Sequence, residues 1–324
     1  MTKKLKFMDF CAGIGAGRLG LENAGLSCVA FSEIDKNAEI TYRQFFGNNE
    51  ENYGDLTKIS PSELPDFDLM IAGFPCQTFS VVGQRKGFDD ARGRIIYSLI
   101  KILKEKNIPY FVLENVKGLI NHNKGQTLKT ILKDLDDVGY NVSYEVLNSI
   151  DYGVPQMRER IYFIGVRKDL PQGKFKFKCP ISSKTVDITR FLSSSNKNIL
   201  DEKKQTYKTF LKYLNNKYNK GRFSIEDLLK QDCLVLDTRQ SDLRLYKNKI
   251  PTLRTGRHGI LYVKDNKFKK LSGGEALMLQ GIPENLVRRL DGKLEEGTIL
   301  KQAGNAMTVN VIEQISKQLL EHVS

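Results

Sequence analysis

The chain has 324 residues, and its 51 lysines and arginines against 38 aspartates and glutamates leave a formal net charge of +13. Hydrophobic residues make up 40% of it, which is enough for a folded core and argues against disorder. No uncharged apolar stretch reaches the roughly 18 residues of a membrane span, and residues 1–6 lack the apolar segment of a signal peptide. The five cysteines form no CxxC pair and only three histidines occur, so we expect no disulfide framework, no metal and a reducing, cytoplasmic setting.

The first 165 residues alternate between strand-like and helix-like segments. Short apolar runs typical of buried strands are followed by apolar residues at helical spacing. Asp35 stands where it can cap one of these helices. The expected strands are 5–10, 28–34, 68–72, 110–113, 142–147 and 161–166, and the expected helices are 19–24, 36–46, 95–103, 128–138 and, near the C-terminus, 309–320. The alternation predicts an α/β fold with a doubly wound, mostly parallel sheet covered by helices on both faces.

The pattern breaks near Pro171, and the following 60 or so residues are rich in serine, asparagine and lysine with few clear periods. Between residues 168 and 222 the chain has 14 lysines and arginines against 4 aspartates and glutamates, so this stretch supplies +10 of the net charge. Phenylalanines and tyrosines are interleaved with the basic residues, a combination typical of a surface that binds a polyanion. A lysine-rich face that is merely solvated would have the same composition.

A glycine-rich loop follows the first expected strand. It reads Gly13-Ile14-Gly15-Ala16-Gly17, and with Gly20 it matches a dinucleotide-binding fingerprint in which the backbone approaches a ligand at a helix N-terminus. An acid about 20 residues further on is expected to bind ribose hydroxyls, and Glu33 fits that role better than Asp35, the expected helix cap. By itself the loop would also suit a nicotinamide-dependent oxidoreductase, or a tight turn with no ligand.

Reactive side chains stand at the ends of later strands. In doubly wound folds the carboxyl ends of the parallel strands form the crevice where ligands bind. A thiol, a carboxyl group and paired cations at this crevice would form one active site. Taken singly, they could be an inert cysteine, a helix cap and a surface charge cluster. The residues are Cys76 in Gly73-Phe74-Pro75-Cys76-Gln77, Glu114 and Asn115 after the strand at 110–113, and Arg158 and Arg160 before the strand at 161–166.

Together these motifs resemble a bacterial cytosine-5 DNA methyltransferase of the restriction–modification type. The resemblance covers nearly the whole chain except about residues 171–237, where the family keeps its variable target-recognition segment. The matching segments are Asp9-Phe10-Cys11-Ala12-Gly13-Ile14-Gly15, Glu33, Gly54-Asp55, Gly73-Phe74-Pro75-Cys76-Gln77, Glu114-Asn115-Val116, Gln156-Met157-Arg158-Glu159-Arg160 and Gly304-Asn305-Ala306. We expect a catalytic domain of residues 1–190 plus 290–324 and a DNA target-recognition domain of residues 191–289.

The resemblance implies a role for each catalytic residue. Cys76 would attack C6 of a cytosine flipped out of the duplex, because a base inside the stack cannot be reached. Glu114 would hold or protonate N3, which lets electron density gather at C5. Arg160 would bind O2 of the base, Arg158 would help to position the nucleophile and the DNA, and Asn115 would brace the loop that holds Glu114.

The resemblance also implies S-adenosyl-L-methionine, rather than a nicotinamide, in the glycine loop. Glu33 would bind the ribose, and Asp55 would meet the adenine amino group. Many relatives have a phenylalanine at the position of Cys11 that stacks near the adenine; the cysteine could pack there without that stacking. The implied cofactor-binding residues are Cys11, Gly13, Gly15, Glu33, Asp55 and Asn305.

DNA contacts are expected in two places. Residues 78–94 resemble the family's mobile loop that closes over bound DNA, a lid that is polar and punctuated by glycines. Residues 238–242 and 255–259 stand where relatives have two base-reading loops, although arginine and glutamine suit phosphate as well as base edges. The candidate DNA-binding residues are Gln84, Arg92, Arg239, Gln240, Arg257 and His258.

The predicted function is therefore methylation of C5 of cytosine within a specific double-stranded DNA sequence, by a monomer with no membrane association. A cognate restriction endonuclease acting on the same site is a possible partner that the sequence does not decide. The main alternative is a tRNA cytosine-5 methyltransferase, because one eukaryotic-type branch of the family methylates tRNA with the same core. A DNA-binding module with a dead pocket is a further alternative, disfavoured because all the catalytic residues are present.

Overall fold

The computed structural model describes residues 4–74, 94–178, 186–193, 196–239, 243–256 and 258–324. The chain divides into two compact units. The first consists of Met1–Asn148, Glu159–Ile181 and Ala306–Ser324, and the second of Ser149–Arg158 and Ser182–Asn305. The stretch 191–289, which we expect to form the recognition domain, falls within the second unit, and that unit extends beyond it at both ends.

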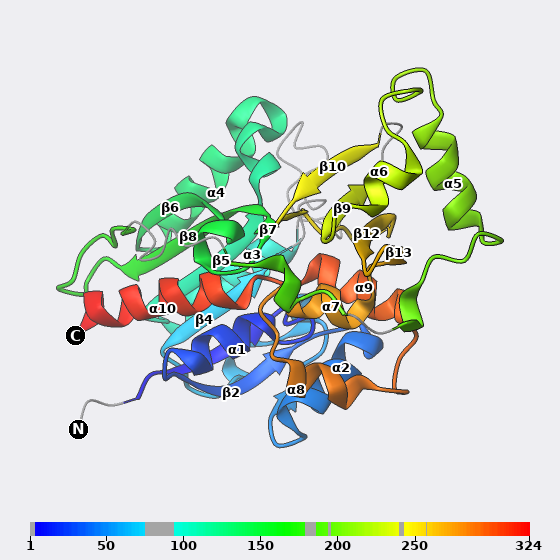
Figure 1. Ribbon diagram of the computed structural model, residues 1–324. Helices are drawn as coiled ribbons and strands as arrows, with labels where there is room; N and C mark the ends of the chain where they lie inside the picture. Colours follow the sequence, from blue (N-terminus) through cyan, green and yellow to red (C-terminus); the bar gives the residue numbers. More distant parts are fainter. Residues whose placement is uncertain (1–3, 75–93, 179–185, 194–195, 240–242, 257) are drawn as a thin grey trace. The chain divides into compact units, whose positions relative to one another are not determined.

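The first unit is built on a seven-stranded sheet with the strand order β3-β2-β1-β4-β5-β8-β6 (Figure 1). Strands β3 to β5 in this order are parallel, whereas β8 runs antiparallel to β5 and β6. The predicted α/β fold with a mostly parallel sheet is confirmed. Residues 149–158, which join β6 to β8, are too short for the crossover that parallel neighbours require. The bounds are β1 (Lys6–Phe10), β2 (Ser27–Ser32), β3 (Glu51–Asn52), β4 (Leu69–Gly73), β5 (Tyr110–Val116), β6 (Tyr140–Asn148) and β8 (Glu159–Arg167).

Five α-helices of the described chain belong to this unit: α1 (Ala16–Asn23), α2 (Lys36–Phe46), α3 (Arg94–Lys106), α4 (Gln126–Asp137) and α10 (Val309–Val323). Asp35 caps α2 as predicted, since its Oδ1 accepts hydrogen bonds from the N–H groups of Asn37 and Ala38. Helix α10 (red in Figure 1) packs against α1 (blue) so closely that a Cβ on Gly20 would lie 2.6 Å from Ile312 Cβ. The C-terminal helix is therefore an integral part of the first unit.

The second unit contains a four-stranded antiparallel sheet with the order β10-β9-β12-β13. One face of it packs on α5 and α6 through a cluster that includes Phe210, Leu228, Leu236 and Val263. Strands of only four or five residues give no clear alternation, which explains why the sequence did not predict them. The bounds are α5 (Gln205–Leu214), α6 (Ile225–Leu229), β9 (Leu234–Asp237), β10 (Arg244–Lys247), β12 (Ile260–Lys264), β13 (Lys267–Lys270), α7 (Gly273–Met278), α8 (Glu284–Val287) and α9 (Glu296–Asn305), with a short parallel pair of β7 (Gln156–Met157) and β11 (Ile250–Pro251).

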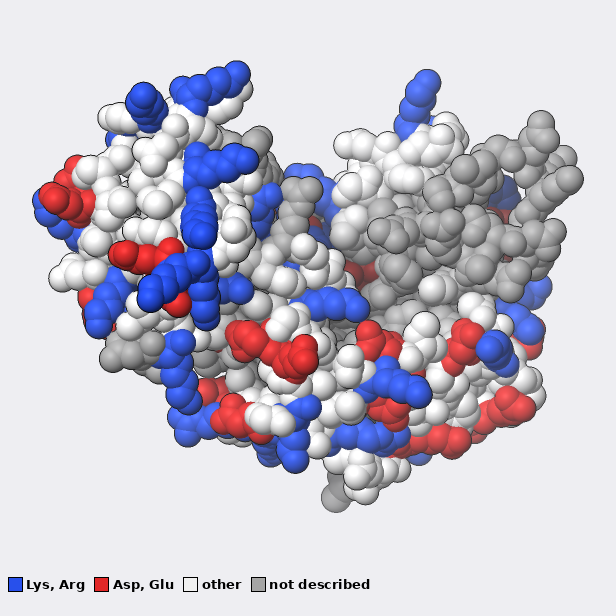
Figure 2. Space-filling model, turned by 90° about the vertical axis from the view of Figure 1, so that its right-hand side faces the viewer, with Lys and Arg blue, Asp and Glu red and all other residues white. Residues whose placement is uncertain are grey.

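The basic stretch of the sequence includes α5 and the turn after it. Its lysines and Arg222 are exposed, no acid occurs between residues 203 and 222, and Tyr218 is 58% exposed among them. Within the described chain no lysine between residues 203 and 222 forms an ion pair. Figure 2 shows one face of the molecule, on which basic side chains stand among acidic ones. The segment is therefore a local excess of positive charge. None of the described helices is long and apolar enough to cross a membrane.

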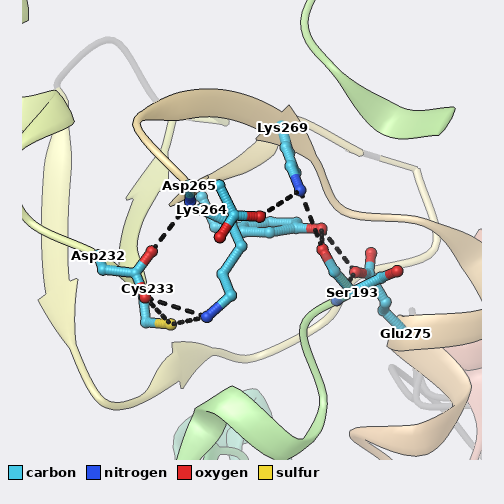
Figure 3. A network of polar contacts seen from close by, with 8 residues as sticks. Ser193, Asp232, Cys233, Lys264, Asp265, Lys269 and Glu275 are labelled. Atoms are coloured by element: carbon cyan, nitrogen blue, oxygen red, sulfur yellow. Dashed lines mark hydrogen bonds and ion pairs between the residues drawn. The ribbon is translucent and has the colours of Figure 1, made fainter. Parts of the chain in front are cut away.

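Glu275 holds the second unit together at the start of α7 (Figure 3). Its carboxylate is 2% exposed and accepts hydrogen bonds from the Tyr262 hydroxyl at 2.6 Å, the Ser193 N–H at 2.7 Å, and the N–H and hydroxyl of Ser272 at 2.8 Å. The ammonium of the fully buried Lys269 donates to the Ser193 carbonyl at 3.2 Å. Both backbone polar groups of Ser193 are thus held, which anchors the segment before α5 to the sheet.

Candidate functional site

The strands expected to carry the catalytic residues end side by side. In the parallel pair β4–β5, Gly73 stands opposite Glu114. The side-chain amide of Asn115 donates a 2.9 Å hydrogen bond to the carbonyl of Phe74, a residue that is 3% exposed. Asn115 therefore fixes the backbone at the end of β4, two residues before Cys76.

Glu114 and Arg160 form an ion pair at this edge of the sheet. The register of β5 and β8 pairs Val116 with Arg160, which puts Arg160 on the same face as Glu114, two residues away. Arg160 Nε lies 3.1 Å from Glu114 Oε1, and the side chains are only 12% and 10% exposed. A carboxyl group and a guanidinium so placed can bind a planar ligand that presents a hydrogen-bond donor next to an acceptor.

Arg158 has a different environment, in the second unit. It is 2% exposed, and its guanidinium donates to the carbonyls of Leu253 and Gly304, both at 3.2 Å. A Cβ on Gly304 would lie 2.5 Å from the carbonyl carbon of Arg254, so only glycine allows this approach. Arg158 thereby ties together three segments of the second unit, and Asn305, the exposed last residue of α9, follows directly.

The glycine loop and Glu33 are brought together as the sequence suggests. One carboxylate oxygen of Glu33 accepts the N–H of Gly13 at 2.7 Å, and the other accepts the N–H groups of Ile34 and Asp35 at 2.8 and 2.7 Å. Gly13 has a φ of +56°, and nothing lies within 4 Å of where its Cβ would be. Glu33 thus shapes a loop that leaves open space beside Gly13.

Gly15 is constrained by packing. Its φ is +80°, and a Cβ there would lie 2.4 Å from the Phe46 ring and 2.9 Å from the Tyr42 ring. Arg18 supports this corner, because it pairs with Glu50 at 2.8 Å and its guanidinium carbon lies 4.2 Å from the centre of the Phe46 ring. The glycine at position 15 is therefore required both by its backbone angle and by its neighbours.

At neutral pH the side chain of Cys11 is uncharged, whereas that of Asp55 is ionised. Burial, together with the nearby Glu33 and Asp9, raises the pKa of the Cys11 thiol to about 12, so it packs as a neutral group. The hydrogen bond from the Thr57 hydroxyl holds the pKa of Asp55 below its usual value, and the carboxylate accepts that bond at 2.8 Å. Asp55 therefore stays ionised and can accept further hydrogen bonds.

Two residues of this region were not singled out from the sequence. Ile34, directly after Glu33, is 72% exposed. An apolar residue between two acids at the end of a strand was a signal in the sequence for such an exposed apolar side chain. Asp9 in β1 is fully buried, and burial raises its pKa well above the ordinary value against the opposing charge of Arg18. Asp9 stands in a matched segment, but its burial could not be read from its type.

Thr238 and Gly259, at the ends of the two candidate base-reading loops, lie side by side in the second unit. The N–H and hydroxyl of Thr238 both donate to the carbonyl of Gly259, at 2.9 and 2.8 Å. Burial, followed by the charges of Lys270 and Arg239, lowers the pKa of His258, so this side chain is neutral at pH 7. The loops that follow β9 and precede β12 are thus joined at their base.

Arg239 is not presented to solvent. It is 7% exposed, and its Nε and Nη2 donate to the two carboxylate oxygens of Asp237 at 2.7 and 2.8 Å, while Nη1 donates to the Thr252 carbonyl at 2.7 Å. The charge and hydrogen bonds of Arg239 keep the pKa of Asp237 low although burial opposes this. The expected sites at Cys76, Gln84, Arg92, Gln240 and Arg257 lie outside the described residues.

The chain is similar in sequence to known DNA methyltransferases. The family described as C-5 cytosine-specific DNA methylase matches residues 5–321. Type II methyltransferase M1.ScrFI of Lactococcus lactis subsp. cremoris is 37% identical over 99% of this chain and 79% of its own length. The orphan methyltransferase M.Rho11sI of Bacillus phage rho11s is 51% identical over 52% of this chain and 34% of its own length.

Solved structures show the same fold. The Entamoeba histolytica methyltransferase EhMeth aligns over the whole of both chains with a TM-score of 0.72 at 16% identity. The match of fold extends over both units, and the sequence match covers all but the first four and last three residues. The chain therefore belongs to the C-5 cytosine-specific DNA methylase family.

Proposed function

We propose that this protein transfers a methyl group from S-adenosylmethionine to C5 of a flipped-out cytosine in a specific double-stranded DNA sequence, through a covalent bond between Cys76 and C6. One observation carries the proposal. The chain belongs to this family, and its Arg160 Nε lies 3.1 Å from Glu114 Oε1 at the edge of the sheet. At the same edge Asn115 holds the backbone that leads to Cys76. A carboxyl group and a guanidinium so paired match N3 and O2 of cytosine.

The chemistry assigns a task to each of these residues. An ordinary thiol has a pKa of about 8.5, so little thiolate exists at neutral pH, and the cationic motif around Arg160 would raise that fraction. The thiolate of Cys76 adds to C6, and Glu114 holds or protonates N3, which keeps negative charge off the ring. After C5 has taken up the methyl group, loss of its proton and of Cys76 restores the ring.

The glycine loop fits S-adenosylmethionine, which would supply the methyl group as a good electrophile. The space beside Gly13 is open, and the Glu33 carboxylate borders it. In this proposal Glu33 binds the ribose, the ionised Asp55 accepts a hydrogen bond from the adenine amino group, and neutral Cys11 packs beside the cofactor. Gly15 would contribute to cofactor binding through its backbone, and Asn305 through its side chain.

DNA recognition is proposed for the second unit. The joined loops after β9 and before β12 present His258, with Gln240 and Arg257 in the same segments. The basic segment around α5 would contact phosphates, and Gln84 and Arg92 would act from the loop that follows Cys76. Arg239 would contribute by holding the first loop through Asp237, or by releasing that contact on DNA.

The biological setting is also a proposal. The relatives named as type II methyltransferases favour a modification enzyme that protects host DNA from a restriction endonuclease acting on the same site, whereas the phage relative is named as an orphan. In either setting the protein would act as a monomer in the cytoplasm, where the DNA lies.

The test is expression of the protein in a host that lacks cytosine methylation, followed by bisulfite sequencing of its plasmid. We expect 5-methylcytosine within one sequence context, and none with Cys76→Ser, whose DNA binding should persist because phosphate contacts dominate affinity. Methylation by the Cys76→Ser variant would overturn the mechanism. The alternative of tRNA methylation is tested by methyl transfer in vitro to tRNA and to duplex DNA. If that alternative holds, tRNA is methylated and duplex DNA is not.

A further inference from the structure

A cavity lies between helices of the first unit, and its lining includes no residue of the glycine loop or of the Glu114–Arg160 pair. Its volume is about 260 Å³, slightly below the range of about 300–1,000 Å³ of typical small-ligand sites. Helices α3 and α4 (Figure 1) and the turn that leads into α4 supply its walls. The lining residues are Ile96, Tyr97, Asn123, Gln126, Thr127, Thr130, Ile131 and Asp134.

The cavity has an apolar floor and a polar rim. Ile96 and Ile131 are 1% and 2% exposed, and the hydroxyl of the buried Thr127 is engaged by His122 Nδ1 at 2.7 Å. Tyr97, by contrast, is 38% exposed. A ligand in this cavity would therefore cover an aliphatic surface and meet polar groups only around its edge.

The backbone at the rim is strained. Asn123, Lys124 and Gly125 have φ values of +48°, +53° and +81°, three consecutive residues in the left-handed region. Non-glycine residues visit this region singly and at a cost of about 1–2 kcal/mol each, and such strain concentrates at functional sites. The turn places Asn123 and Gln126 on the cavity wall.

The charge of the cavity is negative in a strongly basic protein. Asp134 is the one ionisable acid of the lining, and among the described residues its carboxylate has no hydrogen bond or ion pair. Burial first, and then the charge of Asp137, raises the pKa of Asp134, against the opposing charge of Lys133. Burial and the charge of Asp134 likewise raise the pKa of Tyr97. The Asp134 carboxylate is thus half-buried beside the Tyr97 ring, and in the part of the chain that the structure describes no cation is paired with it.

We propose that this cavity binds an organic cation of the size of an arginine side chain. Its guanidinium would pair with Asp134 and stack on the Tyr97 ring, and its alkyl part would lie on Ile96 and Ile131. A phosphate or another anion would be repelled by Asp134. A free guanidino compound and an arginine of a partner polypeptide present the same group, and the test separates them.

The test is a titration of the full-length protein with butylguanidinium, followed by amide NMR, and a parallel titration with the uncharged butylurea. We expect saturable shifts around Tyr97, Thr130 and Asp134 with the cation, and at least about tenfold weaker binding of the urea, the equivalent of about 1.4 kcal/mol. Equal binding of the two compounds, or no saturable binding, would overturn the proposal.

Asp134→Asn supplies the matched variant, because it removes one charge at nearly constant shape. We expect it to weaken butylguanidinium binding by about tenfold or more. The control is Asp137→Asn on the same helix, whose carboxylate is exposed and paired with Lys133; it should bind as the wild type does. Wild-type affinity in Asp134→Asn would overturn the assignment. Tighter binding of an arginine-containing tripeptide than of butylguanidinium would assign the ligand to a polypeptide, and weaker binding to a small molecule.

Discussion

Two buried acid–arginine pairs show how the two units of the molecule differ. In the first unit, Arg160 Nε lies 3.1 Å from Glu114 Oε1, and the side chains of Glu114 and Arg160 are 10% and 12% exposed. In the second unit, Arg239 donates hydrogen bonds to both carboxylate oxygens of Asp237 at 2.7 and 2.8 Å and a third to a backbone carbonyl. The side chains of Arg239 and Asp237 are 2% and 5% exposed.

The difference shows that the residue types of a charged pair do not reveal whether it binds a ligand or stabilises the fold. A bidentate, fully hydrogen-bonded pair costs much desolvation and repays it only through excellent geometry, so it locks the backbone around it. A pair at the end of a strand, on the sheet edge where ligands bind, can exchange a contact for one with a ligand. We therefore propose that the first pair serves the chemistry, whereas the second holds the backbone of a loop in place.

Changing Glu114 should have the largest effect and tests the chemical half of this comparison. Glu114→Gln keeps the shape but removes the acid, and acid–base catalysis typically contributes about 10²–10⁴-fold. We expect the rate of methyl transfer in single-turnover assays to fall by that order, with unchanged affinity for S-adenosylmethionine. Glu159→Gln, at an exposed pair with Lys117, is the control and should keep the wild-type rate. A large loss of cofactor affinity in Glu114→Gln would assign Glu114 to the cofactor pocket.

Changing Asp237 tests the architectural half. Asp237→Asn leaves Arg239 buried without its counter-charge, and breaking a buried pair costs about 3–5 kcal/mol. We expect a fall of this size in the free energy of unfolding, measured by urea denaturation and circular dichroism. Glu284→Gln, at the exposed pair with Arg288, should change it by less than about 1 kcal/mol. Equal effects of the two substitutions would show that the buried pair is not structural.

The same pair predicts a dependence on pH. Because Arg239 holds the pKa of Asp237 below its unfolded value, the pair contributes its stability above the unfolded pKa of about 3.9. That contribution is lost as the pH falls through the lower pKa of the folded state. The stability of the wild type should therefore decline below about pH 4 more steeply than that of Asp237→Asn. Parallel pH profiles would contradict this.

Glu275 should give an intermediate effect in the same unit. Glu275→Gln removes the charge from four hydrogen bonds, and charged hydrogen bonds are worth about 1.5–3 kcal/mol against about 1 kcal/mol for neutral ones. Since the amide can still make some of them, we expect a loss of about 2 kcal/mol in the free energy of unfolding. Glu275→Ala should lose more, because it removes the acceptor of all four hydrogen bonds, including those from the Tyr262 hydroxyl and the Ser193 N–H. An unchanged stability in both variants would contradict the role of Glu275.

Much of the first unit could be predicted because its signals are local. Asp35 stands at a recognisable cap position and caps its helix as expected. Glu33, 20 residues after Gly13 and directly after a strand, lies against the glycine loop. The antiparallel β6–β8 pair was not predicted, although the short connection between its strands was a usable signal.

The second unit was less predictable because its residues do not follow burial rules. Lys269 is fully buried in a strand of four residues, three of them lysines, and no hydropathy pattern reveals this. The burial of Arg239 had a readable signal, since Asp237 stands two residues earlier on the same face of an extended chain. Arg239 was expected to contact DNA because it stands in a candidate base-reading loop and arginine suits that role, whereas the structure pairs it with Asp237.

The smallest effect is expected from the exposed lysines of the second unit, and it sharpens the comparison by separating phosphate contacts from base reading. Lys203, Lys204 and Lys208 are exposed and have no ion pair in the described chain. If all three reach phosphates, replacing them with glutamine should flatten the log–log dependence of DNA affinity on salt by about 0.9 for each lysine. The preferred DNA site should not change, because phosphate contacts carry no direct sequence information.

The control for the lysines is substitution of His258, in a loop joined to Thr238 at its base. We expect His258→Ala to lower the preference for the cognate site while the salt slope stays near that of the wild type. Fluorescence anisotropy at several salt concentrations, on cognate and scrambled duplexes, measures both quantities at once. An unchanged slope in the triple variant would mean that the lysines form a solvated face. An equal loss of affinity on both duplexes in His258→Ala would mean that this loop holds the backbone, and base reading would then fall to residues 238–242.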